Sequence, residues 1–384
     1  MSPELILNGY PLTIRHKGVG AYTVRLIMTL REHAPDLDFR VLLPEVCRAK
    51  AEGLPEDVFL FVNGRPPIER SLGQDIYWNH RLAGVARQRF PKAIYHSAGE
   101  TWSLHKPERL IVTLHDCIYR HFPRLLGGRV RKWWWTSTER YARRADIVLT
   151  DSEASRTDLI THCGIQPARC RILYPWIDAR FTPARAQRDA EAVRAKYGLP
   201  PRFLLYVGGY NINKNIEFLI EAYALARRRD ATLPPLVLAG GIPTDLALAV
   251  CDVHGAIQRA GLAPAEIVAP GFIDEADLPG LYRAASLFVF PSLYEGFGYT
   301  PAEAIAVGTP VLAADATSLK EVIPWPENRF PLDDPATLAH LLVAATNDPA
   351  PFRRELPAAF RSEFGIRAYV EILRSLPSRH SAGL

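Results

Sequence analysis

Short apolar runs alternate with helical patterns along the whole chain of 384 residues. This alternation predicts parallel sheets flanked by helices, because each strand needs a crossover segment before the next parallel strand begins. In the first half, the predicted strands are 5–7, 39–43, 93–95, 110–114 and 147–150. In the second half, they are 203–207, 236–239, 266–268, 287–290 and 310–314. The predicted fold class is therefore α/β, with two separate sheets.

The stretch between the two groups of strands predicts a domain boundary. Residues 174–201 are rich in proline, and no strong strand pattern begins before residue 203. A chain of 384 residues is also long for one core and comfortable for two. We therefore place one domain at 1–180 and a second at 181–365.

The composition is that of an ordinary globular protein, with 48% hydrophobic residues and a formal net charge of +5. The five cysteines lack C-x-x-C spacing, which indicates neither a disulfide framework nor a zinc site. No apolar stretch approaches the ~20 residues of a membrane span, and the N-terminus lacks the regions of a signal peptide. We expect a cytoplasmic protein whose contact with a membrane, if any, is peripheral at its inner face.

The segment 291–315 sets two glutamates, Glu295 and Glu303, at a fixed distance around a predicted helix start. We expect this helix to begin at Pro301 with Thr300 as its cap, which directs free amide groups and a positive dipole end towards Glu295. Phosphate groups bind readily at such helix ends. The alternative is a capping box, in which Glu303 only bonds back to Thr300 and starts the helix.

This segment resembles the E-x7-E signature of the retaining, two-domain glycosyltransferases of family 4. The resemblance implies that Glu295 contacts hydroxyls of a donor sugar and that Glu303 contacts the ribose. It also implies that the backbone amides of Phe297 and Gly298 support the sugar. Further matches to the family are concentrated at 17–22, 115–116 and 206–216.

The first strand-to-helix turn of the second half, VGGYNINKNIEF, holds a further candidate site. Gly208 and Gly209 turn the chain after the strand, and Asn215 is placed to cap the next helix. Lys214 can neutralise the charge that develops on the β-phosphate when a nucleoside diphosphate departs. The alternative is a lysine that is merely exposed in a turn.

This turn resembles the G-G-Y-D-P-R-K-N loop of bacterial family 4 enzymes, with one departure. Asn213 stands where an arginine usually precedes the lysine. The closest pattern is that of mannosyltransferase-like enzymes of cell-surface polysaccharide assembly, which implies GDP-mannose or a related GDP-sugar as donor. The missing cation leaves a second hypothesis open, a catalytically inactive relative that serves as a binding or scaffold subunit.

Glycines also mark a strand-to-helix turn in the first half. Gly18 and Gly20, next to Lys17, precede a predicted helix and would admit a phosphate or a sugar close to the backbone. The pattern resembles the G-[IV]-G-x-Y-[TV] loop of family 4. Together with Glu45 it would also suit an NAD-dependent oxidoreductase, but that hypothesis explains neither Glu295 nor the second sheet.

His115 and Asp116 end the strand at 110–114, at the edge where open α/β sheets bind ligands. Family 4 often has such a pair facing the donor sugar and the acceptor. The alternative is a histidine that only completes a turn. Other polar residues at equivalent sheet edges have a weaker claim, and these are His96, Ser97, Ser152 and Arg156.

A basic and aromatic cluster covers residues 124–144. Its members are Arg124, Arg129, Arg131, Lys132, Trp133, Trp134, Trp135, Arg140, Arg143 and Arg144. Such a cluster suits the anionic head groups of a membrane, or a diphosphate. The alternative is a helix with a solvated basic face whose other face packs on the core, and this packed face would be formed by Val130, Trp133, Trp134, Ser137 and Tyr141.

We expect no nucleic acid as a partner, because the chain carries no binding motif of that class. The D-x-D spacing at 36–38 occurs in some metal-dependent transferases, but here it precedes a strand, and we interpret it as a turn. We predict no metal and no cofactor, with a nucleotide sugar as co-substrate.

The resemblance implies the GT-B architecture, two Rossmann-like domains whose parallel sheets face a central cleft. The first domain would bind a glycan or lipid-linked glycan acceptor, and the second the donor. The last segment, 366–384, is predicted to be a helix that crosses back to the first domain. The residues predicted for catalysis are Glu295, His115, Lys214 and Asp116. Those predicted for donor binding are Glu303, Phe297, Gly298, Gly296, Tyr299, Thr300, Gly208, Gly209, Asn213, Gly18 and Gly20.

Overall fold

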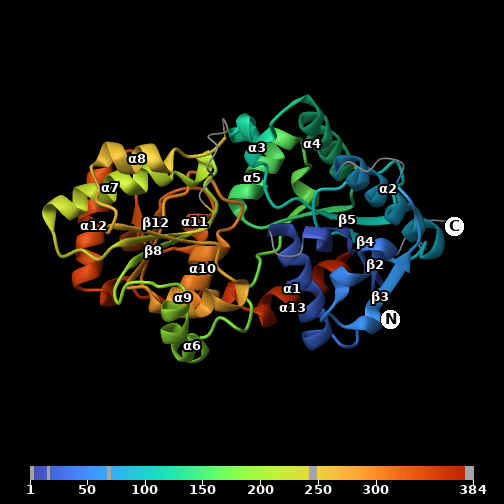
Figure 1. Cartoon of the computed structure of the whole chain (residues 1–384). Coiled ribbons are helices and arrows are strands. Elements are labelled where there is room, and N and C mark those ends of the chain that lie inside the picture. Colours follow the sequence, from blue (N-terminus) through green and yellow to red (C-terminus); the bar gives the residue numbers. More distant parts are fainter. Residues whose placement is uncertain (1–3, 15–17, 67–70, 242–248, 377–384) are drawn as a thin grey trace. The chain divides into compact units, whose positions relative to one another are not determined.

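The computed structural model describes residues 4–14, 18–66, 71–241 and 249–376 (Figure 1). By its contacts the chain forms two compact units. Unit 1 consists of Met1–Arg120, Leu126–Trp176 and Ser362–Leu384, and unit 2 consists of His121–Leu125 and Ile177–Arg361. Each unit contains one sheet, and every strand pair in both sheets is parallel. The predicted α/β class with two parallel sheets is therefore confirmed.

The sheet of unit 1 has the strand order β3-β2-β1-β4-β5-β6-β7. Its strands are β1 (Leu5–Asn8), β2 (Phe39–Pro44), β3 (Phe59–Val62), β4 (Ile94–Ser97), β5 (Arg109–Thr113), β6 (Ile147–Thr150) and β7 (Cys170–Ile172). The order reverses between β1 and β4, so the carboxyl ends of these central strands form the topological switch point of the unit.

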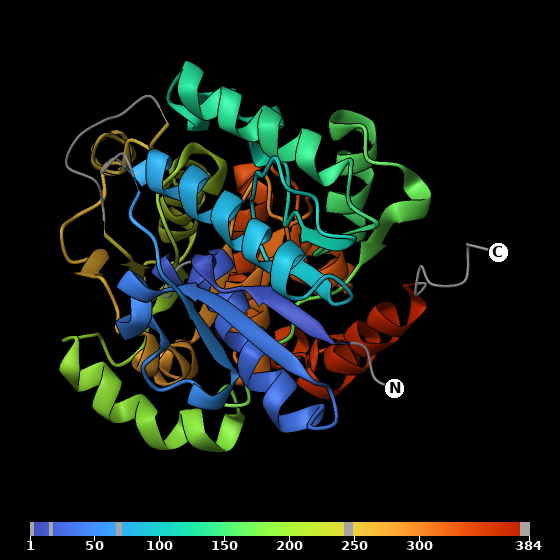
Figure 2. The same cartoon turned by 90° about the vertical axis from the view of Figure 1, so that its right-hand side faces the viewer.

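Helices cover both faces of this sheet (Figure 2). Leu5 and Leu7 of β1 join the core formed with α1 (Gly18–His33) and α13 (Ser362–Ser375). Ile6 between them joins the opposite core, formed with α2 (Ser71–Arg89), α4 (Arg129–Ala142) and α5 (Glu153–Cys163). Successive strand side chains point to opposite faces, which is why the strands of this doubly covered sheet are apolar throughout.

The last described helix, α13, belongs to unit 1 although it follows unit 2 in the chain. The Tyr369 hydroxyl lies 2.6 Å from Nδ1 of His96, whose Nε2 lies 2.8 Å from the Thr113 hydroxyl. Burial lowers the pKa of His96 to about 3. Strand β4 runs from Ile94 to Ser97, so His96 and Ser97 lie inside it, and the prediction that they follow this strand is wrong. The part of the predicted helix at 377–384 lies outside the described residues.

The sheet of unit 2 has the order β10-β9-β8-β11-β12-β13. Its strands are β8 (Leu204–Val207), β9 (Leu236–Ala239), β10 (Ile267–Gly271), β11 (Leu287–Phe290), β12 (Val311–Ala314) and β13 (Arg329–Phe330). Its helices include α6 (Pro183–Lys196), α7 (Ile216–Arg229), α8 (Val253–Ala260), α9 (Leu278–Ala284), α10 (Tyr299–Ala306) and α12 (Pro335–Asn347). Helix α7 packs against α8 and α12, and α9 packs against α6 and α10.

The strand order of unit 2 is that of dinucleotide-binding folds. In these folds the first three strands are added towards one edge of the sheet, and the next three towards the other edge. The point of reversal lies between two central neighbouring strands. Here these neighbours are β8 and β11. In such open sheets, ligands bind outside the carboxyl ends of the strands at this reversal. The topology therefore directs attention to the loops after β8 and β11.

Several boundaries differ from the sequence predictions. The chain leaves unit 1 after Trp176, whereas the domain boundary expected from the sequence is at residue 180. Strands β3, β7 and β13 were not predicted, and each lies at a sheet edge. Asp36 and Leu37 form a turn before β2, as predicted. Within the described residues, no helix combines the length and apolar character needed to cross a bilayer.

Candidate functional site

Lys214 and Glu295 meet at the switch point of unit 2. Lys214 ends a short 3-10 turn, Ile212–Lys214, that follows β8, and Glu295 lies on the loop that follows β11. Nζ of Lys214 lies 2.5 Å from Oε1 of Glu295, and the two side chains are only 20% and 15% exposed. Lys214 is therefore not an exposed turn lysine. A cation and a carboxylate, both reachable from solvent, lie at the place where the topology predicts a ligand.

Asn213, next to Lys214, joins the same two loops. Its backbone carbonyl accepts a hydrogen bond from the Leu293 amide at 2.8 Å, and its side-chain Nδ2 donates to the Tyr294 carbonyl at 3.2 Å. The Asn213 side chain is buried, and its Oδ1 has no hydrogen-bond partner within the described residues. Asn213 therefore tethers the chain next to Glu295 and does not present a charge or an amide to solvent.

A third loop, after β12, holds the Glu295 loop in place. The Glu295 amide donates to the Thr317 hydroxyl at 3.1 Å. The Ser318 hydroxyl lies 2.9 Å from the carbonyl of Glu295 and 2.8 Å from that of Phe297, and it can donate to either. Sequence reasoning missed Thr317 and Ser318. The available signal was a pair of hydroxyl residues in the loop that follows the buried strand β12.

The helix after Glu295 begins earlier than predicted. Helix α10 starts at Tyr299, and Gly298 is its N-cap residue with φ of 111°. This left-handed conformation suits glycine, and a Cβ there would lie only 2.8 Å from Cδ2 of Leu319. The prediction that Thr300 caps a helix beginning at Pro301 is wrong, since the buried Thr300 hydroxyl makes no hydrogen bond within the described residues.

Glu303 lies in the second turn of α10, where it is buried at 4% exposure. Its Oε2 accepts a hydrogen bond from the Tyr282 hydroxyl at 3.1 Å. The capping box between Thr300 and Glu303 is therefore not formed. Glu303 is oriented by Tyr282 of α9, and its contact with a ribose stays a prediction.

The remaining predicted residues of unit 2 lie on the same loops. Gly208 and Gly209 follow β8 directly, and the Gly209 carbonyl accepts a hydrogen bond from the Tyr206 hydroxyl at 2.6 Å. Asn215 precedes α7 with φ of 56° and makes no side-chain capping bond, so the predicted cap is wrong. The loops after β8 and β11, together with the first turns of α10, thus carry the predicted site residues of this unit.

In unit 1, His115 lies after β5 and is held from two sides. Its Nδ1 lies 2.8 Å from Oδ2 of Asp151, and its Nε2 lies 3.2 Å from the carbonyl oxygen of Ala98. Burial disfavours the charged ring, but the Asp151 carboxylate outweighs this effect and raises the pKa of His115 to about 9. Both acceptors suit a doubly protonated ring, so His115 is a fixed positive charge at neutral pH.

Asp116 and the glycine turn lie near this charge. Oδ1 of Asp116 accepts a hydrogen bond from the Ile118 amide at 2.9 Å, and burial raises the pKa of Asp116 to about 6. Gly18 and Gly20 form the first turn of α1, so the prediction that they precede the helix is wrong. The Tyr22 ring of α1 lies edge-on to His115 with centroids 4.9 Å apart. Lys17 lies outside the described residues.

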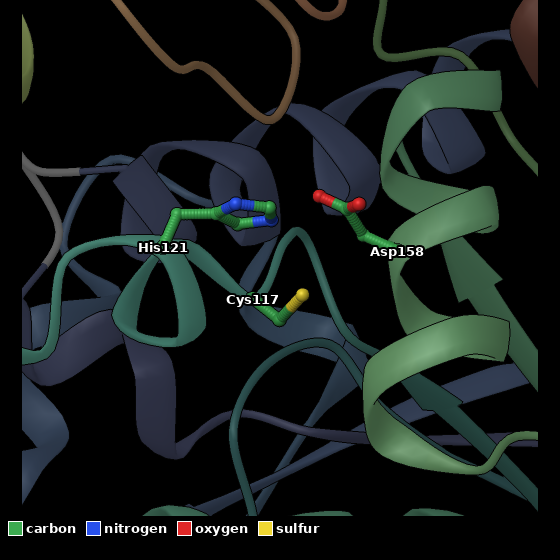
Figure 3. Close-up of side chains that lie close together, drawn as sticks. All are labelled: Cys117, His121 and Asp158. Carbon is green, nitrogen blue, oxygen red and sulfur yellow. The ribbon is translucent and has the colours of Figure 1, made fainter.

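Other candidates in unit 1 have structural roles. Ser152 accepts a hydrogen bond from the Ser155 amide and caps α5. Nε of Arg156 donates to the Cys170 carbonyl at 3.1 Å. Figure 3 shows the side chains of Cys117 and Asp158, which belong to unit 1, and of His121; all three are of types that can bind a metal ion. His121 belongs to unit 2, and we assign no metal site to these side chains.

Replacing Asp151 with asparagine should lower the pKa of His115, because the neutral amide cannot stabilise the charged ring. A folded-state pKa near 9, above the ordinary 6.5, stabilises the fold fully below pH 6.5, and this stabilisation is lost as pH rises through 9. The free energy of unfolding should fall over this range in the wild type and fall less in Asp151→Asn. NMR titration of the imidazole and urea unfolding at several pH values measure both effects. Glu32→Gln, next to the exposed His33, is the control. A wild-type pKa of His115 below 7 would contradict this assignment.

Comparison with known proteins identifies both halves of the chain. The family model for Glycosyltransferase Family 4 matches residues 16–181, and the model for Glycosyl transferases group 1 matches residues 201–348. The serotype-specific mannosyltransferase WbdA of Escherichia coli is 27% identical over 379 residues, which cover 92% of this chain and 44% of WbdA. The O-antigen chain mannosyltransferase B of Escherichia coli is 31% identical over 232 residues, covering 60% of this chain and 59% of that protein. The chain thus spans less than half of WbdA.

Solved structures match nearly the whole chain. HepE of Anabaena in complex with UDP and glucose has a TM-score of 0.67 at 20% identity and covers 98% of this chain and 100% of its own. WaaG, a glycosyltransferase involved in lipopolysaccharide biosynthesis, has a TM-score of 0.64 at 18% identity, and the match covers 99% of this chain and 100% of the WaaG chain. These structures confirm the predicted GT-B fold. The chain belongs to the glycosyltransferases, with a family 4 domain in its first half and a group 1 domain in its second.

Proposed function

We propose that this protein is a retaining glycosyltransferase that moves a sugar from a nucleoside diphosphate to an acceptor hydroxyl in cell-surface polysaccharide assembly. The observation that supports this proposal most is the pair of Lys214 and Glu295 at the switch point of unit 2, 2.5 Å apart. It offers a cation for the diphosphate and a carboxylate for the sugar at adjacent positions.

Lys214 would stabilise the leaving group. As the bond between the anomeric carbon and the β-phosphate oxygen breaks, negative charge develops on the diphosphate. The Lys214 side chain is 20% exposed, so its charge acts in a medium less polar than bulk water. A fixed ammonium group there also supplies the positive charge that a metal ion supplies in other transferases, which is the basis for proposing a metal-independent reaction.

Glu295 would hold the sugar by its hydroxyl groups. Its loop is fixed by Thr317, Ser318 and Asn213, so the carboxylate and the nearby amides of Phe297 and Gly298 keep their positions. Fixed groups of this kind orient a reacting centre without reorganisation during the reaction. Glu295 already faces Lys214, which makes it unsuited to act as a nucleophile on the sugar.

Retention of configuration then requires the acceptor oxygen to attack on the face that the leaving group vacates. The acceptor proton passes to an oxygen of the departing phosphate, so no protein base is needed. Each ring nitrogen of His115 carries a proton at neutral pH, because the Asp151 carboxylate raises the pKa of His115 to about 9. We propose that His115 contributes positive charge only, because both ring N–H groups already face acceptors within unit 1, and that it does not remove the acceptor proton.

The donor would be GDP-mannose or a related GDP-sugar. The relatives that cover most of this chain are named mannosyltransferases, and one is named for O-antigen chains. The acceptor would be a glycan, free or linked to a lipid. The buried Asn213 favours a second candidate, an inactive relative that binds nucleotide sugar without transfer, since the family's arginine is absent there.

Lys214→Ala should weaken binding of GDP at least about tenfold, because one charge-assisted contact with a diphosphate is worth about 1.5–3 kcal/mol. Isothermal titration calorimetry measures this change. Lys320→Ala is the matched control, since Lys320 lies in the same unit and pairs with Asp315 at 3.7 Å. Equal affinity for GDP in Lys214→Ala and the wild type would refute the role of Lys214.

Glu295→Gln should reduce sugar transfer and slow donor hydrolysis far more than it reduces GDP binding, because the proposed contact is with the sugar. The assay uses GDP-mannose and UDP-glucose with a mannan oligosaccharide as acceptor. Glu266→Gln is the control, since Glu266 is similarly 21% exposed and pairs with Arg227 at 2.7 Å before β10. Equal losses in binding and transfer would indicate a folding role for Glu295. Donor binding by the wild type without any turnover would favour the inactive relative.

A further inference from the structure

Helix α4 of unit 1 is exposed in its first half and buried in its second. Val130 is 65% exposed and Trp133 is 46% exposed, whereas Trp134, Ser137 and Tyr141 are buried. The prediction that all five share one packed face is therefore wrong for Val130 and Trp133. Two large apolar side chains near the start of this helix face solvent, and the core does not account for them.

A loop from elsewhere in unit 1 extends this apolar surface. The ring of Trp102, after β4, lies 6.0 Å from that of Trp133. His80 of α2 stacks on Trp102 at 6.3 Å and lies 3.3 Å from the Leu104 amide, which fixes the loop. Leu104 itself is 68% exposed. We call Trp102, Leu104, Val130 and Trp133 the aromatic ridge.

Basic side chains border the ridge. Residues 126–133 of unit 1 include Arg129, Arg131 and Lys132, all exposed, and no acidic residue. Arg131 acts electrostatically on Asp75 of α2, but in the described part of the chain no ion pair involves Arg129 or Lys132. At 100° per residue, Trp133 and Val130 share one strip of the helix, with Arg129 and Lys132 along one side of it.

We propose that the aromatic ridge and its basic border form a docking surface for an anionic lipid bilayer. Tryptophan favours the boundary between lipid and water, because its ring is apolar and its N–H is polar. Arginine and lysine beside it attract anionic head groups. An apolar ridge alone would equally suit a protein partner, whereas the uncompensated charges of Arg129 and Lys132 favour an anionic one. This surface lies in unit 1 and is independent of the donor chemistry proposed for unit 2.

Sedimentation with vesicles tests this inference. The full chain should bind vesicles of phosphatidylcholine mixed with phosphatidylglycerol, and bind them less as salt increases. The double variant Arg129→Glu and Lys132→Glu should lose about tenfold or more in affinity. Trp133→Ala should weaken binding severalfold, and Trp133→Phe should restore part of it. Circular dichroism and thermal unfolding confirm that each variant is folded.

Two control variants lie away from the ridge. Phe364→Ala removes an aromatic side chain of α13 that is 44% exposed, close to the 46% of Trp133, and Arg188→Glu reverses an exposed charge on α6. Both should bind vesicles like the wild type. Absence of vesicle binding, equal binding to pure phosphatidylcholine, or equal losses in the controls would overturn the proposal. So would a dimer that dissociates in Trp133→Ala, because the ridge would then serve a second copy. Donor hydrolysis is measured separately and should not change in Trp133→Ala.

Discussion

The ion pair between Lys214 and Glu295 joins the loops after β8 and β11 at the carboxyl edge of the unit 2 sheet, and the candidate site is built around it. Two opposite charges can be partly buried together because each offsets the desolvation of the other. Asn213 reinforces the contact, since its backbone and its side chain both bind the chain just before Glu295. Thr317 and Ser318 then attach the loop after β12 to the same place. Three loops at the carboxyl edge of one sheet thus hold each other in a single arrangement.

This arrangement also explains the asparagine that stands in place of the family's arginine. A buried arginine would need its own counter-charge, whereas the neutral Asn213 needs none, although its Oδ1 has no hydrogen-bond partner within the described residues. The chain has one fixed cation in this loop, Lys214, and a neutral tether next to it. In unit 1, His115 is held between Asp151 and the Ala98 carbonyl, which keeps a second positive charge in a fixed position.

Much of the fold could be predicted from the sequence, because buried parallel strands are continuous apolar runs. The missed strands β3, β7 and β13 lie at sheet edges, where burial is partial; β7 and β13 have only 3 and 2 residues, whereas β3 is the apolar run FLFV and was missed although its pattern is present. The glutamates of the candidate site were selected by their place around a predicted helix start and by the family resemblance, and the lysine by its place just before a predicted helix. The partners of His115 and the clamp by Thr317 and Ser318 were not, because they join segments far apart in the chain. The start of α10 was misplaced because Gly298 adopts a left-handed conformation that residue types alone do not reveal.

The central claim is that Lys214 and Glu295 receive the two ends of one activated sugar. A crystal structure of the protein with GDP-mannose tests it most directly. The account predicts a β-phosphate oxygen within hydrogen-bond distance of the Lys214 ammonium group and a sugar hydroxyl on the Glu295 carboxylate. A nucleotide sugar bound elsewhere, with the ion pair closed and untouched, would contradict it.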